Sequence, residues 1–144
     1  MTGCCALALS AGALQARVSR DPELSEALAY VEARCPQDGA DVSRSVWQQG
    51  WAFNALYGAC HSTDGGDRHI WFFVHGRFVG MDTKGHSGGI IGMWRDLRTI
   101  AFMYVLYRPS DPECCATGGG KIVRFRWTGR RVEHLEPIPN HRSP

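Results

Sequence analysis

Two apolar runs on either side of His75-Gly76 constrain the fold more than any other feature of this sequence. Residues 70–81 are IWFFVHGRFVGM, so a step of only two residues separates the runs. Such a step predicts a tight β-hairpin. In that hairpin Phe72 faces Val79, and apolar side chains fall on both faces of the pleat. The hairpin therefore belongs inside a sheet that is covered on both sides.

Later segments predict further strands. Residues 99–107 (TIAFMYVLY) are apolar on both sides of any pleat, which is typical of a central strand. Residues 121–127 alternate between apolar and polar, and 131–136 are expected to return beside them. Residues 51–57 are either a first strand or one short helix, and their aromatic side chains favour the strand. A brief strand is expected at 90–91. The residues expected in the core include Phe102, Val105, Phe125 and Trp127.

One helix is expected near the N-terminus, over residues 22–34. Asp21 can cap it, and Pro22 suits its first turn. An apolar stripe at helical spacing predicts the side that packs on the sheet; its members are Leu24, Leu28, Val31 and Cys35. Cys35 precedes a proline, and that position ends a helix because the proline ring clashes with helical geometry before it.

The predicted fold class is therefore α+β, with one N-terminal helix packed on a mainly antiparallel, meander-type sheet of about five or six strands. The chain has 144 residues, of which 44% are hydrophobic, and this fits one domain over residues 17–139 with a tail at 140–144. A net charge of +2 is too small to predict nucleic-acid binding.

The first 16 residues have a different character from the rest. Residues 1–16 carry no charge, are largely apolar and run into small residues, which is typical of a secretory signal. A second interpretation places the true start upstream, so that Thr2-Gly3-Cys4 ends a lipobox and Cys4 carries lipid. A buried N-terminal segment of a cytosolic protein is the remaining alternative.

Four cysteines lie outside this leader, at Cys35, Cys60, Cys114 and Cys115. An even number in a short exported chain predicts a disulfide framework. A bond between Cys114 and Cys115 would close a strained eight-membered ring. We therefore expect two long-range bridges that join Cys35 and Cys60 to the adjacent pair, in an order left open. A zinc site is disfavoured because adjacent thiolates fit one tetrahedral centre poorly.

Catalytic motifs are absent from the sequence. No H-E-x-x-H, G-x-S-x-G or phosphate-loop pattern occurs. His69 and His75, with His61 or His86, are weak metal candidates, and Ser87 beside His86 does not make a triad. We expect no metal and no cofactor. A non-catalytic binding module is favoured, and the alternative is a hydrolytic or metal-dependent enzyme with an unrecognised site.

The C-terminal half is basic, with nine basic and five acidic residues from residue 85 onward. With a two-residue turn at 128–129, Arg124 opposes Glu133 and Arg126 opposes Arg131 on one face. This face is either a solvated surface or a contact for an anionic partner, such as lipid headgroups or an acidic wall polymer.

Several motifs in residues 50–139 resemble the LppP/LprE lipoprotein family of actinobacteria. They are HGRFVG at 75–80, ECCATGGG at 113–120, VRFRWTGRRV at 123–132, LEPIP at 135–139, and the single upstream Cys60. Ala116 departs from the pattern, because proline often follows the cysteine pair. The resemblance implies a cell-envelope protein that is anchored by lipid to the outer face of the membrane. It implies no defined chemistry.

Overall fold

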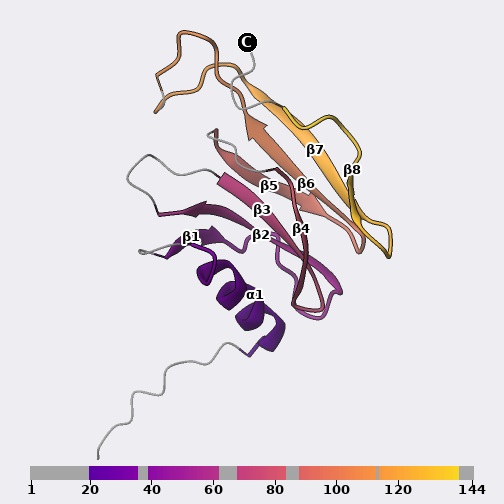
Figure 1. Cartoon of the computed structure of the whole chain (residues 1–144). Coiled ribbons are helices and arrows are strands. Elements are labelled where there is room, and N and C mark those ends of the chain that lie inside the picture. Colours follow the sequence, from indigo (N-terminus) through magenta and orange to yellow (C-terminus); the bar gives the residue numbers. More distant parts are fainter. Residues whose placement is uncertain (1–19, 36–38, 62–67, 84–87, 113, 140–144) are drawn as a thin grey trace, which may run out of the picture.

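The computed structural model describes residues 20–35, 39–61, 68–83, 88–112 and 114–139 (Figure 1). One helix, α1 (Pro22–Glu32), precedes all the strands. The strands are β1 (Ala40–Ser43), β2 (Phe53–Cys60), β3 (Arg68–Val74), β4 (Arg77–Met81), β5 (Ile90–Arg95), β6 (Thr99–Val105), β7 (Gly120–Trp127) and β8 (Val132–His134). The leader, Cys4, His86, Ser87 and the tail lie outside the described residues.

The strands form two antiparallel sheets rather than one. The first sheet has the order β1-β2-β3-β4, and the second has the order β5-β6-β7-β8. Each is a meander, so the predicted topology and the α+β class fit, while the expectation of five or six strands in a single sheet is wrong. The difference arises because the chain starts a new layer after β4 instead of adding β5 to the edge of the first sheet.

Three layers result, with the first sheet in the middle (Figure 1). Ile70 and Phe72 of β3 point into a core shared with the second sheet, whereas Trp71 and Phe73 point into a core shared with α1. Ile70, Phe72 and Phe73 are fully buried, and Trp71 is nearly so. The two-sided apolar pattern of this strand therefore reflects a helix on one face and a second sheet on the other.

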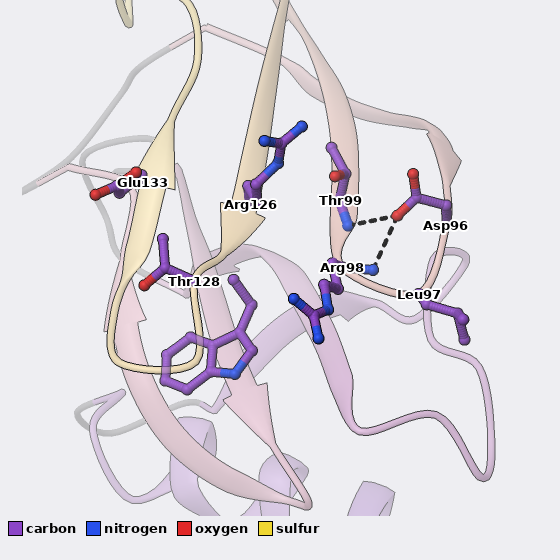
Figure 2. Close-up of a pocket in the computed structure, with 8 residues that line it drawn as sticks. Asp96, Leu97, Arg98, Thr99, Arg126, Thr128 and Glu133 are labelled. Carbon is purple, nitrogen blue, oxygen red and sulfur yellow. Dashed lines mark hydrogen bonds between the residues drawn. The ribbon is translucent and has the colours of Figure 1, made fainter.

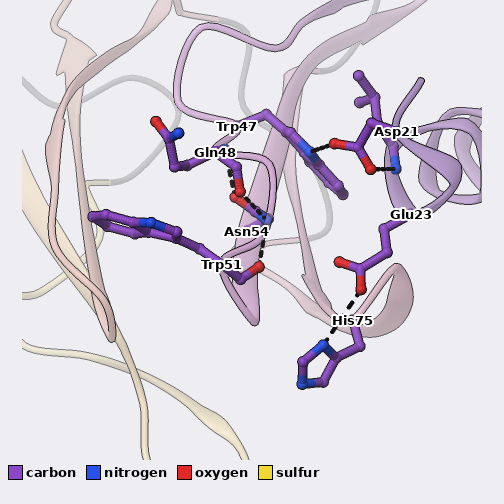
Figure 3. Close-up of polar contacts among 8 residues, drawn as sticks. Asp21, Glu23, Trp47, Gln48, Trp51, Asn54 and His75 are labelled. Atoms are coloured by element: carbon purple, nitrogen blue, oxygen red, sulfur yellow. Dashed lines mark hydrogen bonds and ion pairs between the residues drawn. The ribbon is translucent and has the colours of Figure 1, made fainter. Parts of the chain in front are cut away.

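The helix begins as predicted. The Asp21 side chain accepts a hydrogen bond from the Leu24 amide at 3.1 Å, and Pro22 occupies the first turn. The other Asp21 oxygen accepts from the Trp47 indole at 2.8 Å, so the cap also attaches the helix to the loop before β2 (Figure 3). The helix ends at Glu32, two residues before the predicted end at residue 34.

The turn between β3 and β4 is the predicted two-residue step. His75 and Gly76 both have positive φ, 49° and 75°, as a tight hairpin turn requires. Phe73 pairs with Phe78 as expected, but an irregularity then shifts the register so that Phe72 opposes Gly80 rather than Val79. β4 thus contains one extra residue at this irregularity, and the predicted pairing of Phe72 with Val79 is wrong.

The second sheet confirms part of the predicted core. Phe102 and Phe125 are buried between the sheets, and Trp127 packs against them while remaining half-buried. The prediction that Val105 lies in the core is wrong. Val105 follows the buried Tyr104 on β6, so its side chain points to the other face of the sheet, where it is half-buried.

A polar cluster holds the loop between β1 and β2 against both sheets (Figure 3). The Asn54 side chain, 1% exposed, accepts from the Gln48 amide at 2.8 Å and donates to the carbonyls of Gln48 and Trp51. Arg95 of β5 donates to Asn54 Oδ1 at 2.6 Å and to the Phe53 carbonyl at 2.6 Å. Burial lowers the pKa of Arg95, because a desolvated guanidinium loses hydration.

The disulfide pairing differs from the prediction. Cys35 bonds to Cys60, and Cys114 bonds to Cys115. The helix stripe holds Cys35 in the core between α1 and the first sheet, where Cys60 also packs. The adjacent cysteines lie on the loop between β6 and β7, which belongs to the opposite layer. Because the two pairs lie in opposite layers, each of these four cysteines can bond only to the other member of its own pair.

We expect the two disulfides to differ in their resistance to a mild thiol reductant. Cys114 and Cys115 are exposed, whereas Cys35 is only 7% exposed, and thiol–disulfide exchange requires access to sulfur. Peptide mapping after alkylation should find label at the adjacent pair first. Reduction of the Cys35–Cys60 bond, whose closed loop stabilises the fold by about 3–4 kcal/mol, should require denaturant. Equal labelling rates in the native protein would contradict this order.

Candidate anion-binding site

A shallow cleft opens where the turn between β5 and β6 meets the loop between β7 and β8. Its volume is about 600 Å³. The lining residues are Asp96, Leu97, Arg98, Thr99, Arg126, Trp127, Thr128 and Glu133. Figure 2 shows Glu133, Arg126 and Thr99 side by side across three strands, with Asp96 beyond them. The cleft thus combines two guanidinium groups, two carboxylates and one indole.

The turn between β5 and β6 presents Arg98 to the cleft. Asp96 Oδ1 accepts hydrogen bonds from the Arg98 and Thr99 amides, both at 2.8 Å, and the Asp96 amide donates to the Thr99 carbonyl at 2.8 Å. These amide bonds, aided by the nearby Arg126 guanidinium, lower the pKa of the Asp96 carboxyl. Asp96 therefore remains ionised, but its charge is used to hold the turn.

The loop between β7 and β8 positions the residues on the other side of the cleft. Its four residues, 128–131, place Arg126 opposite Glu133, because Trp127 pairs with Val132. The Thr128 hydroxyl accepts from the Arg130 and Arg131 amides and donates to the Arg131 carbonyl. The predicted two-residue turn is wrong, and so are the predicted pairs Arg124–Glu133 and Arg126–Arg131.

Two of the three arginines proposed from the sequence are already paired. Arg131 donates to Glu133 through Nε at 2.9 Å and Nη2 at 2.7 Å. Arg124 donates to Glu136 through Nε at 2.7 Å, and this bond raises the pKa of Arg124 and lowers that of Glu136. Neither residue therefore offers a free charge to a partner.

Arg126 and Arg98 are different. In the part of the chain that the structure describes, neither guanidinium has a hydrogen bond or an ion pair with a carboxylate. Both side chains are exposed at the cleft. Arg126 was expected from its place in the alternating strand, whereas Arg98 was missed. The one sequence signal for Arg98 is the aspartate two residues before it, which is typical of a turn between strands.

The lining of the cleft contains no histidine, cysteine or lysine. Its two carboxylates are engaged, Asp96 by the amides of its own turn and Glu133 by Arg131. His69 and His75 do not form a metal site: His69 contacts the Thr83 carbonyl at 3.2 Å, and His75 lies on a turn 3.4 Å from Glu23 (Figure 3). Across the described ranges, no group of three histidine, cysteine, aspartate or glutamate side chains could hold a metal ion.

No described helix is long and apolar enough to cross a membrane. Among known proteins, a family model described as LppP/LprE lipoprotein matches residues 55–130, which is more than half of the chain. The match runs from within β2 to the loop after β7, so it contains β3 to β7 and most of the cleft, but neither β1 nor β8. No curated protein and no solved structure matches the chain.

Proposed function

Because the chain belongs to the LppP/LprE lipoprotein family, we propose that it works outside the cytoplasm as a non-catalytic interaction module of the cell envelope. In this proposal it is either lipid-anchored at the membrane, with Cys4 as the attachment site, or secreted. Its partner is an anionic envelope component, either lipid headgroups or an acidic wall polymer. The disulfide between the buried Cys35 and the half-buried Cys60 supports an oxidising compartment.

The observation that carries the proposal is the pair of exposed guanidiniums at the cleft, neither of which has a hydrogen bond or an ion pair with a carboxylate in the described structure. Arg98 and Arg126 lie on neighbouring strand ends, and the carboxylates around them are engaged elsewhere, Asp96 by backbone amides and Glu133 by Arg131. Guanidinium groups bind phosphate and carboxylate oxygens through charge-assisted hydrogen bonds. The Trp127 ring beside them adds an apolar wall. An anionic ligand would satisfy donors that the protein itself leaves open.

Reversing these two charges should abolish polyanion binding. With inorganic polyphosphate immobilised on beads, wild type should be retained at low salt and released as salt rises, because screening weakens exposed charge contacts. Arg98→Glu/Arg126→Glu should pass through at any salt concentration. Arg98→Gln/Arg126→Gln removes both positive charges without adding negative ones. This variant should bind polyphosphate at least about tenfold more weakly than wild type.

Arg44→Glu/Arg77→Glu is the matched control. These arginines are exposed on or beside the first sheet, and their replacement changes net charge by the same amount. The control should be retained like wild type, with unchanged circular dichroism in all variants. Equal retention of the two reversed variants would show that Arg98 and Arg126 are only a solvated surface.

A further inference from the structure

Exposed apolar side chains are concentrated on the second sheet. Seven large hydrophobic residues are exposed in the described parts of the chain, and six of them lie on this sheet or beside its strands. The six are Ile91 (43%), Met93 (45%), Trp94 (46%), Leu97 (66%), Ile122 (46%) and Leu135 (37%), and the seventh is Met81 on β4. Single exposed hydrophobic residues are ordinary, but a set gathered on one face marks an interaction surface.

Strand register brings these side chains together. Ile91, Met103 and Ile122 form one row across β5, β6 and β7. Cross-strand partners point to the same side of a sheet, and Ile122 alternates with the buried Val123, so this row lies on the outer face, away from the first sheet. The outer face therefore begins with a row that is entirely apolar.

Successive rows become more polar toward the cleft. Trp94 lies opposite Ala101, and Arg124 continues that row on β7. The next row contains Thr99, Arg126 and Glu133 and lies at the cleft. The outer face thus changes, along the strands, from an apolar end to a charged end, where Arg98 and Arg126 have no hydrogen bond to a carboxylate.

We propose that this outer face rests on an anionic phospholipid membrane surface. This inference rests on the proposed function and specifies its partner. Headgroup phosphates would lie at Arg98 and Arg126, while Trp94, Ile91 and Ile122 would enter the boundary between headgroups and acyl chains. Amphipathic surfaces that combine basic and apolar side chains bind such membranes through charge attraction and apolar burial together.

Other occupants fit this face less well. A hydrophilic acidic polymer would match the arginines but would leave Ile91, Trp94 and Ile122 in water. A second copy joined through a two-fold axis would bury the same face of both copies, and removing the guanidiniums and carboxylates of both clefts from water is costly. A phospholipid surface satisfies both ends of the face at once.

The test is flotation of the full chain, carrying Cys4→Ser so that no lipid can be attached there, with vesicles of phosphatidylglycerol and phosphatidylcholine. Wild type should float with these vesicles at low salt but not with pure phosphatidylcholine. Trp94→Ser/Ile122→Ser should reduce flotation at least about tenfold, because it removes apolar area that the membrane would bury. The same variant should keep its binding to inorganic polyphosphate, whereas Arg98→Glu/Arg126→Glu should lose both.

Met81→Ser is the control, since Met81 is 40% exposed but lies on the first sheet, and it should float like wild type. If Trp94→Ser/Ile122→Ser floats as well as wild type, or if wild type binds polyphosphate but not vesicles, the membrane inference is wrong and the proposed function stands. If the charge-reversed variant keeps both activities, the proposed function itself fails. Dimerisation by light scattering that depends on Trp94, without vesicle binding, would instead identify an interface between copies.

Discussion

Replacing Phe125 by alanine should lower the free energy of unfolding by about 3–5 kcal/mol. Phe125 is 2% exposed, and its ring centroid lies 4.9 Å from that of Phe72 and 6.1 Å from that of Phe102. Alanine would therefore open a cavity between the two sheets that these rings cannot fill without moving the backbone. Urea denaturation with both disulfides intact should report the loss as a lower midpoint at unchanged slope.

Ile122→Ala provides the comparison on the same strand. Ile122 is 46% exposed on the outer face, so its truncation should cost less than about 1 kcal/mol. A larger loss at Ile122 than at Phe125 would mean that the two faces of β7 are assigned the wrong way round.

Replacing Asn54 by leucine should also destabilise the protein strongly, by about 3–5 kcal/mol. Leucine has a similar volume but can neither accept from the Gln48 amide nor donate to the carbonyls of Gln48 and Trp51. It would also remove an acceptor from the partly buried Arg95, whose Nε already has no partner within the described structure. Thermal unfolding should show the loss as a clearly lower Tm.

Gln48→Leu is the control that distinguishes the contribution of the Asn54 side chain from that of the loop around Gln48. Only the backbone of Gln48 takes part in the cluster, and its side chain is exposed, so this variant should stay within about 0.5 kcal/mol of wild type. A comparable loss in both variants would show that the loop, rather than the Asn54 side chain, supplies the stability.

Local features of the fold could be predicted because their causes are local. The Asp21 cap depends on the three residues after it, and the His75-Gly76 turn depends on its own backbone conformations. The strand predicted over 99–107, which spans 99–105 in the structure, follows from a continuous apolar run, and the strand over 121–127 follows from side-chain alternation. β1 was missed because Ala40–Ser43 is short and partly polar, and it is a strand only through its pairing with β2.

The site was predicted in part for the same reason. Alternation placed Arg124 and Arg126 on one face of β7, and the structure keeps them there. Which of them carries an unpaired charge depends on register, and register depends on whether the following loop has two or four residues. Arg98 could not be assigned to the site, because its neighbours in the cleft come from strands distant in sequence.

By itself, the sequence determined that the hairpin at 70–81 is covered on both sides and that a capped helix precedes it. It did so because burial pattern, capping and turn geometry act over a few residues. Only the tertiary structure decided that a helix and a second sheet provide the two covers, that Cys35 bonds to Cys60, and that Arg98 joins Arg126 beside an apolar face. Those outcomes depend on which layers pack together. The free energy of that packing is a sum over many contacts between residues that are far apart in the chain.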